Sequence, residues 1–334
     1  MHPVFTNIFN NGNKIEVDMY ELIKNELIKI FYRRKTYILL FVSIIYIFSY
    51  NYVQKITNLN IDIKHQYLNA YSNDILLLKN YNNLNITEEY YNIIERMHLD
   101  KYAIENNIEY NILVNSENDK IPLPEDARIL LMRIYNNFEI IIVLIIIYLS
   151  SIMILEEYST GTIKYLLIKP YSRFHILVSK IIAIILTIIL LILFFTLFQY
   201  IIGGILFGFD SYTLEAIIYN NSIHNIETMN LFKYMVIISI SKFPMYLLLI
   251  LICFLIGVIT TNAYLNILIT FLVYLISKIN LSFFSITKYI FIYNWDLSTH
   301  LSNYYNFARA LLISLISIVC ILNIFIFIFR NKDV

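Results

Sequence analysis

Six long apolar runs divide this chain, and polar segments of very different lengths separate them. The runs cover residues 36–53, 138–155, 181–207, 234–259, 264–283 and 307–329. Each holds between 18 and 27 residues, and about 20 apolar residues in an α-helix cross the hydrocarbon core of a bilayer. We therefore predict an all-α polytopic membrane protein with six transmembrane helices.

The composition agrees with this pattern. Hydrophobic residues make up 59% of the 334 residues, charged residues 15%, and the net charge is +1, whereas soluble domains average about 25% charged residues. This small net charge does not indicate a nucleic-acid partner. Cys253 and Cys320 both lie in apolar runs, so we expect them to pack as small hydrophobic residues and not to form a disulfide framework.

The Lys and Arg residues near the ends of the runs predict the orientation, because positive residues are retained in the cytoplasm. With both termini inside, the cytoplasmic segments 1–35, 156–180 and 330–334 hold twelve Lys and Arg residues. The outer segments after the third and fifth runs offer at most four: Lys233, Lys278, Lys288 and Arg309. The loop over residues 54–136 is net acidic, with eight basic and twelve acidic residues. We predict an N-in, C-in topology, with residues 284–306 as an outer re-entrant or connecting segment.

Two segments outside the spans carry helical patterns. In the cytoplasmic segment 1–35, apolar residues recur at helical spacing and predict an amphipathic helix in the membrane interface: Met19, Leu22, Ile23, Leu27, Ile30 and Phe31. The loop 54–136 is too long for a simple connection, so we predict a helical extracellular domain. Within it, Thr87 is a candidate N-cap for a helix with an apolar stripe, formed by Tyr90, Ile93, Ile94 and Met97.

The cytoplasmic loop 156–180 concentrates the residues that change backbone direction. Glycine and proline are scarce, with six and five in the chain, yet Gly161 and Pro170 both fall here. Gly161 permits a tight bend after the second span, and Pro170 ends a short amphipathic helix. We expect this loop to lie across the inner membrane surface and to present charged side chains to the cytosol.

The same loop resembles a known family. Its signature is formed by Glu157, Gly161, Thr162, Lys164, Leu166, Leu167, Pro170, Ser172, Arg173 and Lys180. This run is similar to the E…GT…LL…P…SR…K pattern in the permeases of type-2 ATP-binding-cassette (ABC) exporters. The segment 26–29 before the first span, the enlarged first outer loop and the polar connection around residues 294–297 are similar as well.

The resemblance implies a non-catalytic membrane subunit of an ABC transporter in a prokaryotic plasma membrane. It implies two protein partners: a separate cytoplasmic ATPase that binds ATP and Mg²⁺, and a second permease copy or paralogue. It assigns ATPase coupling to Glu157, Gly161, Thr162, Lys164, Pro170, Arg173 and Lys180. The residues agree on one point, since the sequence has no G-x-x-x-x-G-K-[ST] phosphate loop and hydrolysis would need a partner. We expect no cofactor and no metal on this chain.

Two other functions fit parts of the sequence less well. An intramembrane protease is disfavoured, because Glu156-Glu157 has no matching histidine on a span. A secondary transporter or ion channel is the stronger rival, and Lys242 inside the fourth run is its candidate functional residue. The simpler interpretation of Lys242 is a side chain that snorkels to the outer interface.

Overall fold

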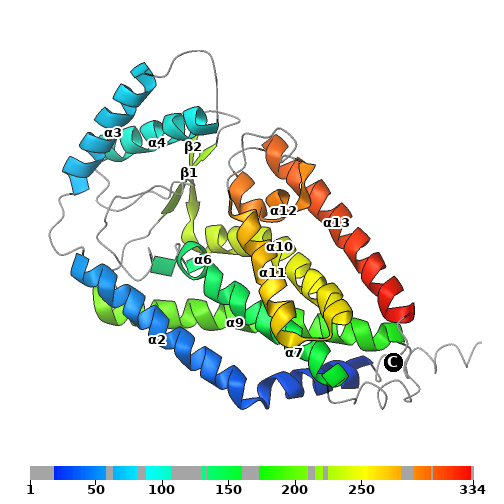
Figure 1. The fold of residues 1–334 in the computed structure, drawn as a ribbon. Coiled ribbons are helices and arrows are strands. Elements are labelled where there is room, and N and C mark those ends of the chain that lie inside the picture. Colours follow the sequence, from blue (N-terminus) through cyan, green and yellow to red (C-terminus); the bar gives the residue numbers. More distant parts are fainter. Residues whose placement is uncertain are drawn as a thin grey trace, which may run out of the picture.

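Helices follow the apolar runs of the sequence in the computed structural model (Figure 1). The structure describes residues 19–57, 63–80, 88–106, 130–131, 134–159, 173–209, 215–220, 225–279, 289–301 and 304–331. Among these residues, five helices are long and apolar enough to cross a membrane. They are α2 (Arg34–Thr57), α7 (Glu139–Ser159), α9 (Arg173–Phe207), α10 (Leu231–Thr260) and α13 (Tyr304–Asn331). They coincide with the first, second, third, fourth and sixth apolar runs.

The helix in the fifth run is shorter than the sequence predicts. Helix α11 (Ala263–Ser277) has 15 residues, which rise about 22 Å and fall short of the roughly 30 Å hydrocarbon core. The predicted span extended to residue 283, but Lys278 caps the helix with αR geometry and residue 279 lies outside it. Residues 280–283 are outside the described part. The prediction of six full-length spans is therefore not met by α11.

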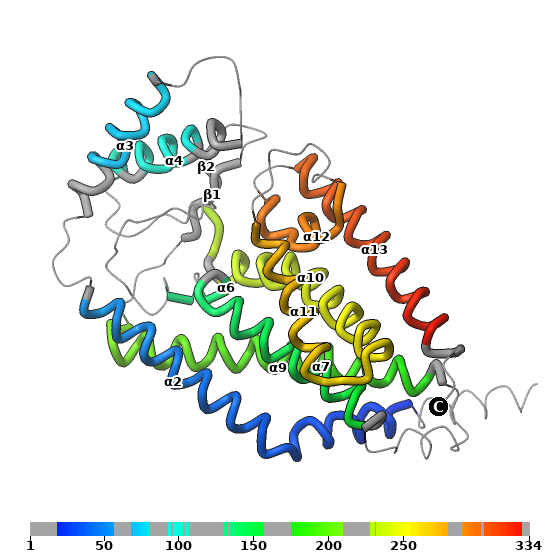
Figure 2. The backbone as a smooth tube through the Cα atoms, viewed as in Figure 1, coloured from blue at the N-terminus to red at the C-terminus, as the bar shows by residue number. Residues whose placement is uncertain are grey.

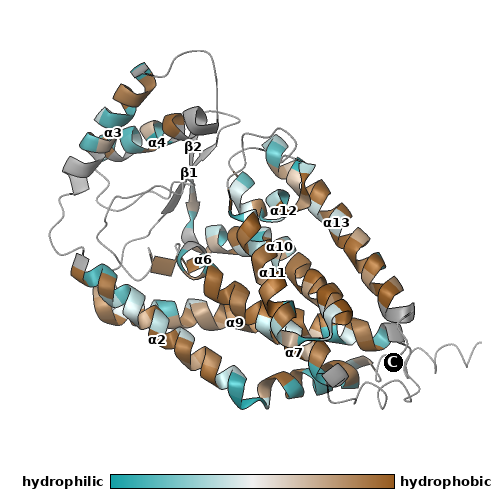
Figure 3. Ribbon diagram, in the orientation of Figure 1, coloured by the Kyte–Doolittle hydropathy of each residue, from teal (hydrophilic) through white to brown (hydrophobic). Residues whose placement is uncertain are grey.

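Helices α7 and α10 form the centre of the bundle. Helix α10 packs against α7, α11 and α13, while α2 runs along α9 (Figure 2). In the most apolar stretches of α7 and α10, 67% and 61% of the residues are buried, against 11% in α13. The core contains aromatic side chains such as Phe138, Phe195, Tyr246 and Phe254. Figure 3 shows the hydrophobic residues along the long helices and the hydrophilic ones at helix ends and in α3 and α4. The peripheral helices thus present apolar faces suited to lipid.

A two-stranded sheet interrupts the helical fold, which the all-α prediction did not include. Strand β1 (Glu215–Asn220) pairs with β2 (Asn225–Asn230) in antiparallel register, with Glu215 opposite Asn230. Asn230 also caps α10, because its side chain accepts a hydrogen bond from the backbone N–H of Phe232 at 2.9 Å. The hairpin therefore runs directly into α10.

The predicted extracellular domain contains two packed helices, α3 (Ile63–Asn80) and α4 (Glu88–Glu105). Helix α4 begins directly after Thr87, as the sequence predicts, although Thr87 itself lies outside the described residues. Ile93 of the predicted apolar stripe is buried. Arg96 of α4 donates to Asp74 of α3 at 2.7 Å, so a charge-assisted hydrogen bond joins the two helices.

The glycines late in the third span end the helix. A Cβ atom on Gly204 would lie 1.8 Å from the Phe209 ring, so the chain folds back closely on Gly204. Gly208 has φ +99° and its N–H donates to the carbonyl oxygen of Gly204 at 2.9 Å. These are the features of a glycine that terminates an α-helix in the left-handed region.

The N-terminal segment is helical over residues 19–31, and we refer to it as the N-terminal helix. Its inward face is formed by Leu22, Glu26 and Ile30, which are spaced four residues apart and are 8%, 4% and 2% exposed. Ile23 and Leu27 pack against the same core. The predicted helix is present and its apolar stripe contacts the other helices of this chain, while its location in the membrane interface stays a prediction.

Candidate functional site

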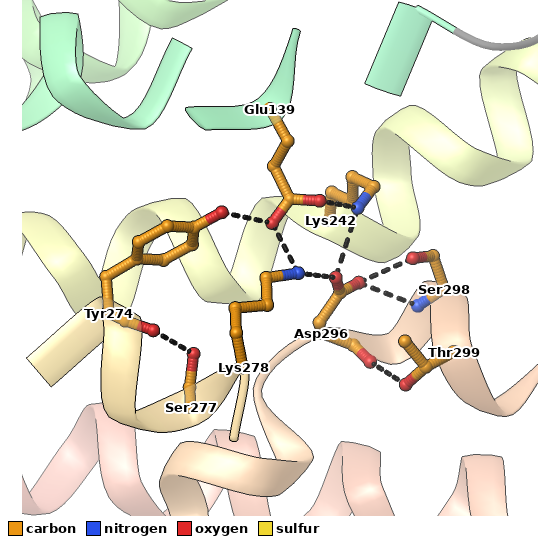
Figure 4. A network of polar contacts seen from close by, with 8 residues as sticks. All are labelled: Glu139, Lys242, Tyr274, Ser277, Lys278, Asp296, Ser298 and Thr299. Carbon is orange, nitrogen blue, oxygen red and sulfur yellow. Dashed lines mark hydrogen bonds and ion pairs between the residues drawn. The ribbon is translucent and has the colours of Figure 1, made fainter. Parts of the chain in front are cut away.

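Four charged side chains form a closed ring at one end of the bundle (Figure 4). Lys242 Nζ lies 2.7 Å from Glu139 Oε2 and 3.1 Å from Asp296 Oδ2. Lys278 Nζ lies 2.6 Å from Glu139 Oε1 and 3.9 Å from Asp296 Oδ2. Acid and base alternate around this arrangement, which we call the charge ring. Each of its members therefore contacts two groups of opposite sign.

Each member of the charge ring comes from a different element. Glu139 is the first residue of α7, and Lys242 lies in α10 two residues before Pro244. Lys278 is the C-cap of α11. Asp296 follows the short helix α12 (Phe291–Asn294) and is the N-cap of the 3₁₀-helix η2 (Leu297–His300). The ring therefore joins segments up to 157 residues apart in sequence.

Further hydrogen bonds fix the two carboxylates. Tyr274 donates its hydroxyl to Glu139 Oε1 at 2.9 Å. Ser298 donates to Asp296 Oδ1 from its backbone N–H at 3.1 Å and from its hydroxyl at 2.6 Å. Buried carboxylates retain their charge only when such donors and opposite charges replace water. The ring thus provides what ionised acids need inside the protein.

Burial distinguishes Lys278 from the other three members. The side chains of Lys242, Glu139 and Asp296 are 3%, 7% and 8% exposed, whereas Lys278 is 38% exposed. Removing one partner of a buried ion pair costs about 3–5 kcal/mol, because a buried charge is left uncompensated. The snorkelling interpretation of Lys242 is therefore wrong, since its ammonium group lies between two acids inside the bundle.

A second buried ion pair holds the N-terminal helix. Lys180, near the start of α9, donates to Glu26 Oε2 at 3.0 Å and to the carbonyl oxygen of Met153 in α7 at 3.4 Å. Lys29 lies 2.8 Å from Glu26 Oε1, and Arg33 pairs with Glu156 at the end of α7. We call these contacts the inner cluster. It joins the N-terminal helix to α7 and α9.

The inner cluster changes the acidity of Glu26. Burial by itself raises the pKa of this carboxyl group. The neighbouring Lys180 and Lys29 lower the pKa by more than burial raises it, so the net pKa lies below the ordinary value of 4.5. Glu26 is therefore ionised at neutral pH. The pairing with Lys180 accordingly joins two full charges.

The structure places the predicted coupling residues unequally. Lys180 is buried in the inner cluster and is not presented to solvent. Glu157 lies near the end of α7 and Arg173 begins α9; their side chains lie outside what the structure describes. The remaining coupling residues, Gly161, Thr162, Lys164 and Pro170, are outside the described residues altogether.

Neutral polar side chains also pair between the long helices, and sequence reasoning did not single them out. Asn51 of α2 and Gln199 of α9 exchange two hydrogen bonds of 3.1 Å. Asn266 of α11 donates to Ser151 of α7 at 3.1 Å and contacts Cys253 of α10 at 3.4 Å. An Asn or Gln side chain within an apolar run was the sequence feature that could have indicated these pairs. Cys253 is buried and free, as expected for a packing residue.

The described residues contain no group of three or more His, Cys, Asp or Glu side chains suited to hold a metal ion. In the charge ring, the two lysines already occupy the positions next to both carboxylates. The arrangement can hold segments together and can exchange ion-pair partners.

The five membrane-length apolar helices in the described part of the chain define a helical, multi-pass membrane protein. The family described as "Protein of unknown function (DUF2705)" matches residues 104–334, more than half of the chain, so the chain belongs to that family. The "Uncharacterized protein YhcI" of Bacillus subtilis (strain 168) is 39% identical over 72 residues. That stretch covers 22% of this chain and 23% of the relative's length. No solved structure matches the chain. None of these matches names an exporter.

Proposed function

We propose that this chain is the membrane-spanning subunit of a type-2 ABC exporter, with ATP and Mg²⁺ bound by a separate cytoplasmic ATPase. A second permease copy or paralogue would complete the pathway. The signature in residues 156–180 supports this proposal, together with the succession of apolar helices and the helical loop after the first of them.

The inner cluster is the observation that carries the proposal. The connection between α7 and α9 includes the coupling signature, and both helices flank it directly. Lys180 of α9 makes buried contacts with Glu26 of the N-terminal helix and with the carbonyl oxygen of Met153 in α7, and Glu156 at the end of α7 pairs with Arg33 just after the N-terminal helix. A force applied to this connection would therefore move three elements together, because breaking a buried ion pair is costly. A subunit driven by an external ATPase needs this property.

The charge ring favours a second candidate, a transporter or channel that works without an ATPase. Ionisable groups inside membrane proteins often mark ion pathways, and Lys242 lies within a membrane-length helix. In such a carrier a buried carboxylate must change partner or protonation state during each cycle. Within the described residues both acids of the ring contact both lysines, and a reconstitution with and without the ATPase separates the two candidates.

Reconstitution with and without the ATPase tests the proposal. We expect the purified chain alone in proteoliposomes to transport nothing under an imposed proton or sodium gradient. With its natural ATPase, cargo should stimulate ATP hydrolysis. Lys180→Gln should reduce this stimulation in assembled complexes, whereas Lys29→Gln, on the half-exposed partner of the same glutamate, should not. Gradient-driven transport by the chain alone would refute the exporter assignment.

A further inference from the structure

The charge ring has a connectivity that allows it to come apart without leaving an unpaired charge. Two of its four contacts join α7 or α10 to the segment formed by α11 and η2: Lys242 with Asp296, and Lys278 with Glu139. The ring thus has two halves, one on α7 and α10 and one on α11 and η2. The other two contacts each lie within one half: Glu139 with Lys242, and Lys278 with Asp296. Separation of the halves therefore breaks two ion pairs and the hydrogen bond from Tyr274 to Glu139, and it keeps two neutral pairs.

The interior face of α11 is polar along its length. Asn266, Thr270, Tyr274 and Lys278 are spaced four residues apart and lie on one face of the helix, and the first three are buried. Leu268 and Leu272, on the other side, are about half exposed. An interface lined with polar groups can be hydrated when it opens, because water can replace the lost hydrogen bonds. An aliphatic interface offers no such replacement.

The two ends of α11 are held differently. At the Thr261 end, a tight turn connects it to α10, and Thr261 has φ 53° in the left-handed region, which is unusual for a β-branched residue. Ser151 of α7 holds this end through Asn266 and the carbonyl oxygen of Ala263. At the other end, the charge ring provides the attachment, and its member Lys278 is the most exposed. The helix thus has a fixed end and an end held by exchangeable charges.

We propose that the charge ring is a latch that divides into the pairs Glu139–Lys242 and Lys278–Asp296. Division occurs when the ring end of α11, together with α12 and η2, swings away from α7 and α10. Lys278, whose side chain is 38% exposed, is the point at which water enters. In the exporter this movement opens the outer end of the pathway, and this part of the proposal rests on the proposed function.

Double neutralisations test the latch, because each removes one acid and one base and keeps the total charge. Lys278→Gln with Asp296→Asn leaves a pair within one half, and so does Glu139→Gln with Lys242→Gln. The matched controls leave a pair that spans both halves: Lys242→Gln with Asp296→Asn, and Glu139→Gln with Lys278→Gln. The latch predicts that the first two variants open and the two controls stay closed.

Spin labels can report the opening in the purified full chain without any ATPase. Cysteines at Ile140 of α7 and Ile276 of α11, which are 54% and 45% exposed, are placed in a Cys320→Ser background. Wild type and both controls should show one short distance population, and the first two variants a predominantly longer one. Labels at Tyr32 and Tyr264, on the opposite end of the bundle, should keep their separation in all proteins.

Equal distance distributions in all four double variants would overturn the latch. Failure of the first two variants to fold, with both controls folded, would overturn it as well, since the latch requires each half to be stable with its own pair. These measurements involve neither ATP nor cargo. Failure of the latch is therefore distinguished from failure of the exporter assignment, which the reconstitution tests separately.

Discussion

At the scale of single residues, Glu26 shows how a charge inside an apolar stripe can hold a helix in place. Replacement by Gln removes the charge that faces the buried ammonium group of Lys180. We expect Glu26→Gln to lower the free energy of unfolding by about 3 kcal/mol or more. Lys29→Gln, at the half-exposed partner, should cost below about 1 kcal/mol. Thermal unfolding of both variants in the same detergent checks the difference.

The same residue predicts a dependence on pH. Because the pKa of Glu26 is lowered in the folded state, its stabilisation is complete above the ordinary value of 4.5 and is lost as the pH falls through the folded-state pKa. Amide hydrogen exchange in residues 19–31 should therefore accelerate, relative to the intrinsic rate, in this acidic window. Glu26→Gln should remove that part of the acid dependence. Unchanged protection of these amides below pH 4.5 in wild type would contradict the prediction.

The sequence indicates charged residues more readily than their partners. Lys242 stands out because it interrupts an apolar run, whereas Glu139 and Asp296 lie at a helix start and in a connection, where acids are ordinary. Lys242 is 103 residues from Glu139 and 54 from Asp296, and no local pattern connects such distances. The burial of Lys180 was missed for the same reason, since Glu26 precedes it by 154 residues.

At the scale of elements, apolar length predicted the helices well and their ends less well. Helix α11 ends at Ser277 although apolar residues continue in the sequence, and the side chain of its C-cap, Lys278, belongs to the charge ring. The hairpin of β1 and β2 was missed because neither six-residue strand, EAIIYN or NIETMN, alternates strictly between apolar and polar residues. The end of α11 and the pairing of β1 with β2 depend on contacts with other parts of the chain, which the spacing of apolar residues does not reveal.

The connection between α7 and α9 gives a prediction at this scale. We expect Gly161→Val and Glu157→Ala to reduce cargo-stimulated ATP hydrolysis per assembled complex, and Arg173→Ala to do so more weakly. A side chain at the bend predicted for residue 161 would restrict the backbone, at a cost of about 1 kcal/mol where φ is positive. Hydrolysis is normalised to intact complex. If protein abundance falls while hydrolysis per complex is unchanged, the loop only connects α7 to α9 and has no role in coupling.

At the scale of the whole molecule, the distribution of Lys and Arg predicts which end of the bundle faces the cytoplasm. A cysteine at Asn118, in a Cys320→Ser background, should react with a membrane-impermeant maleimide added to intact cells. A cysteine at Ser159 in the same background should react only after the membrane is opened. Labelling by mass shift on a gel checks both, and the reverse pattern would overturn the N-in, C-in topology.

The order of the charge ring along the chain also bears on how the protein is synthesised. Glu139 enters the membrane first, Lys242 follows, and Lys278 and Asp296 come last. When the ribosome delivers the helix that contains Lys242, its counter-charge is already present, which lowers the cost of placing an ammonium group in lipid. A nascent chain stopped before residue 296 holds two lysines and one acid of the ring. We expect such chains to be recognised by membrane quality control, and only translation through η2 to release them from it.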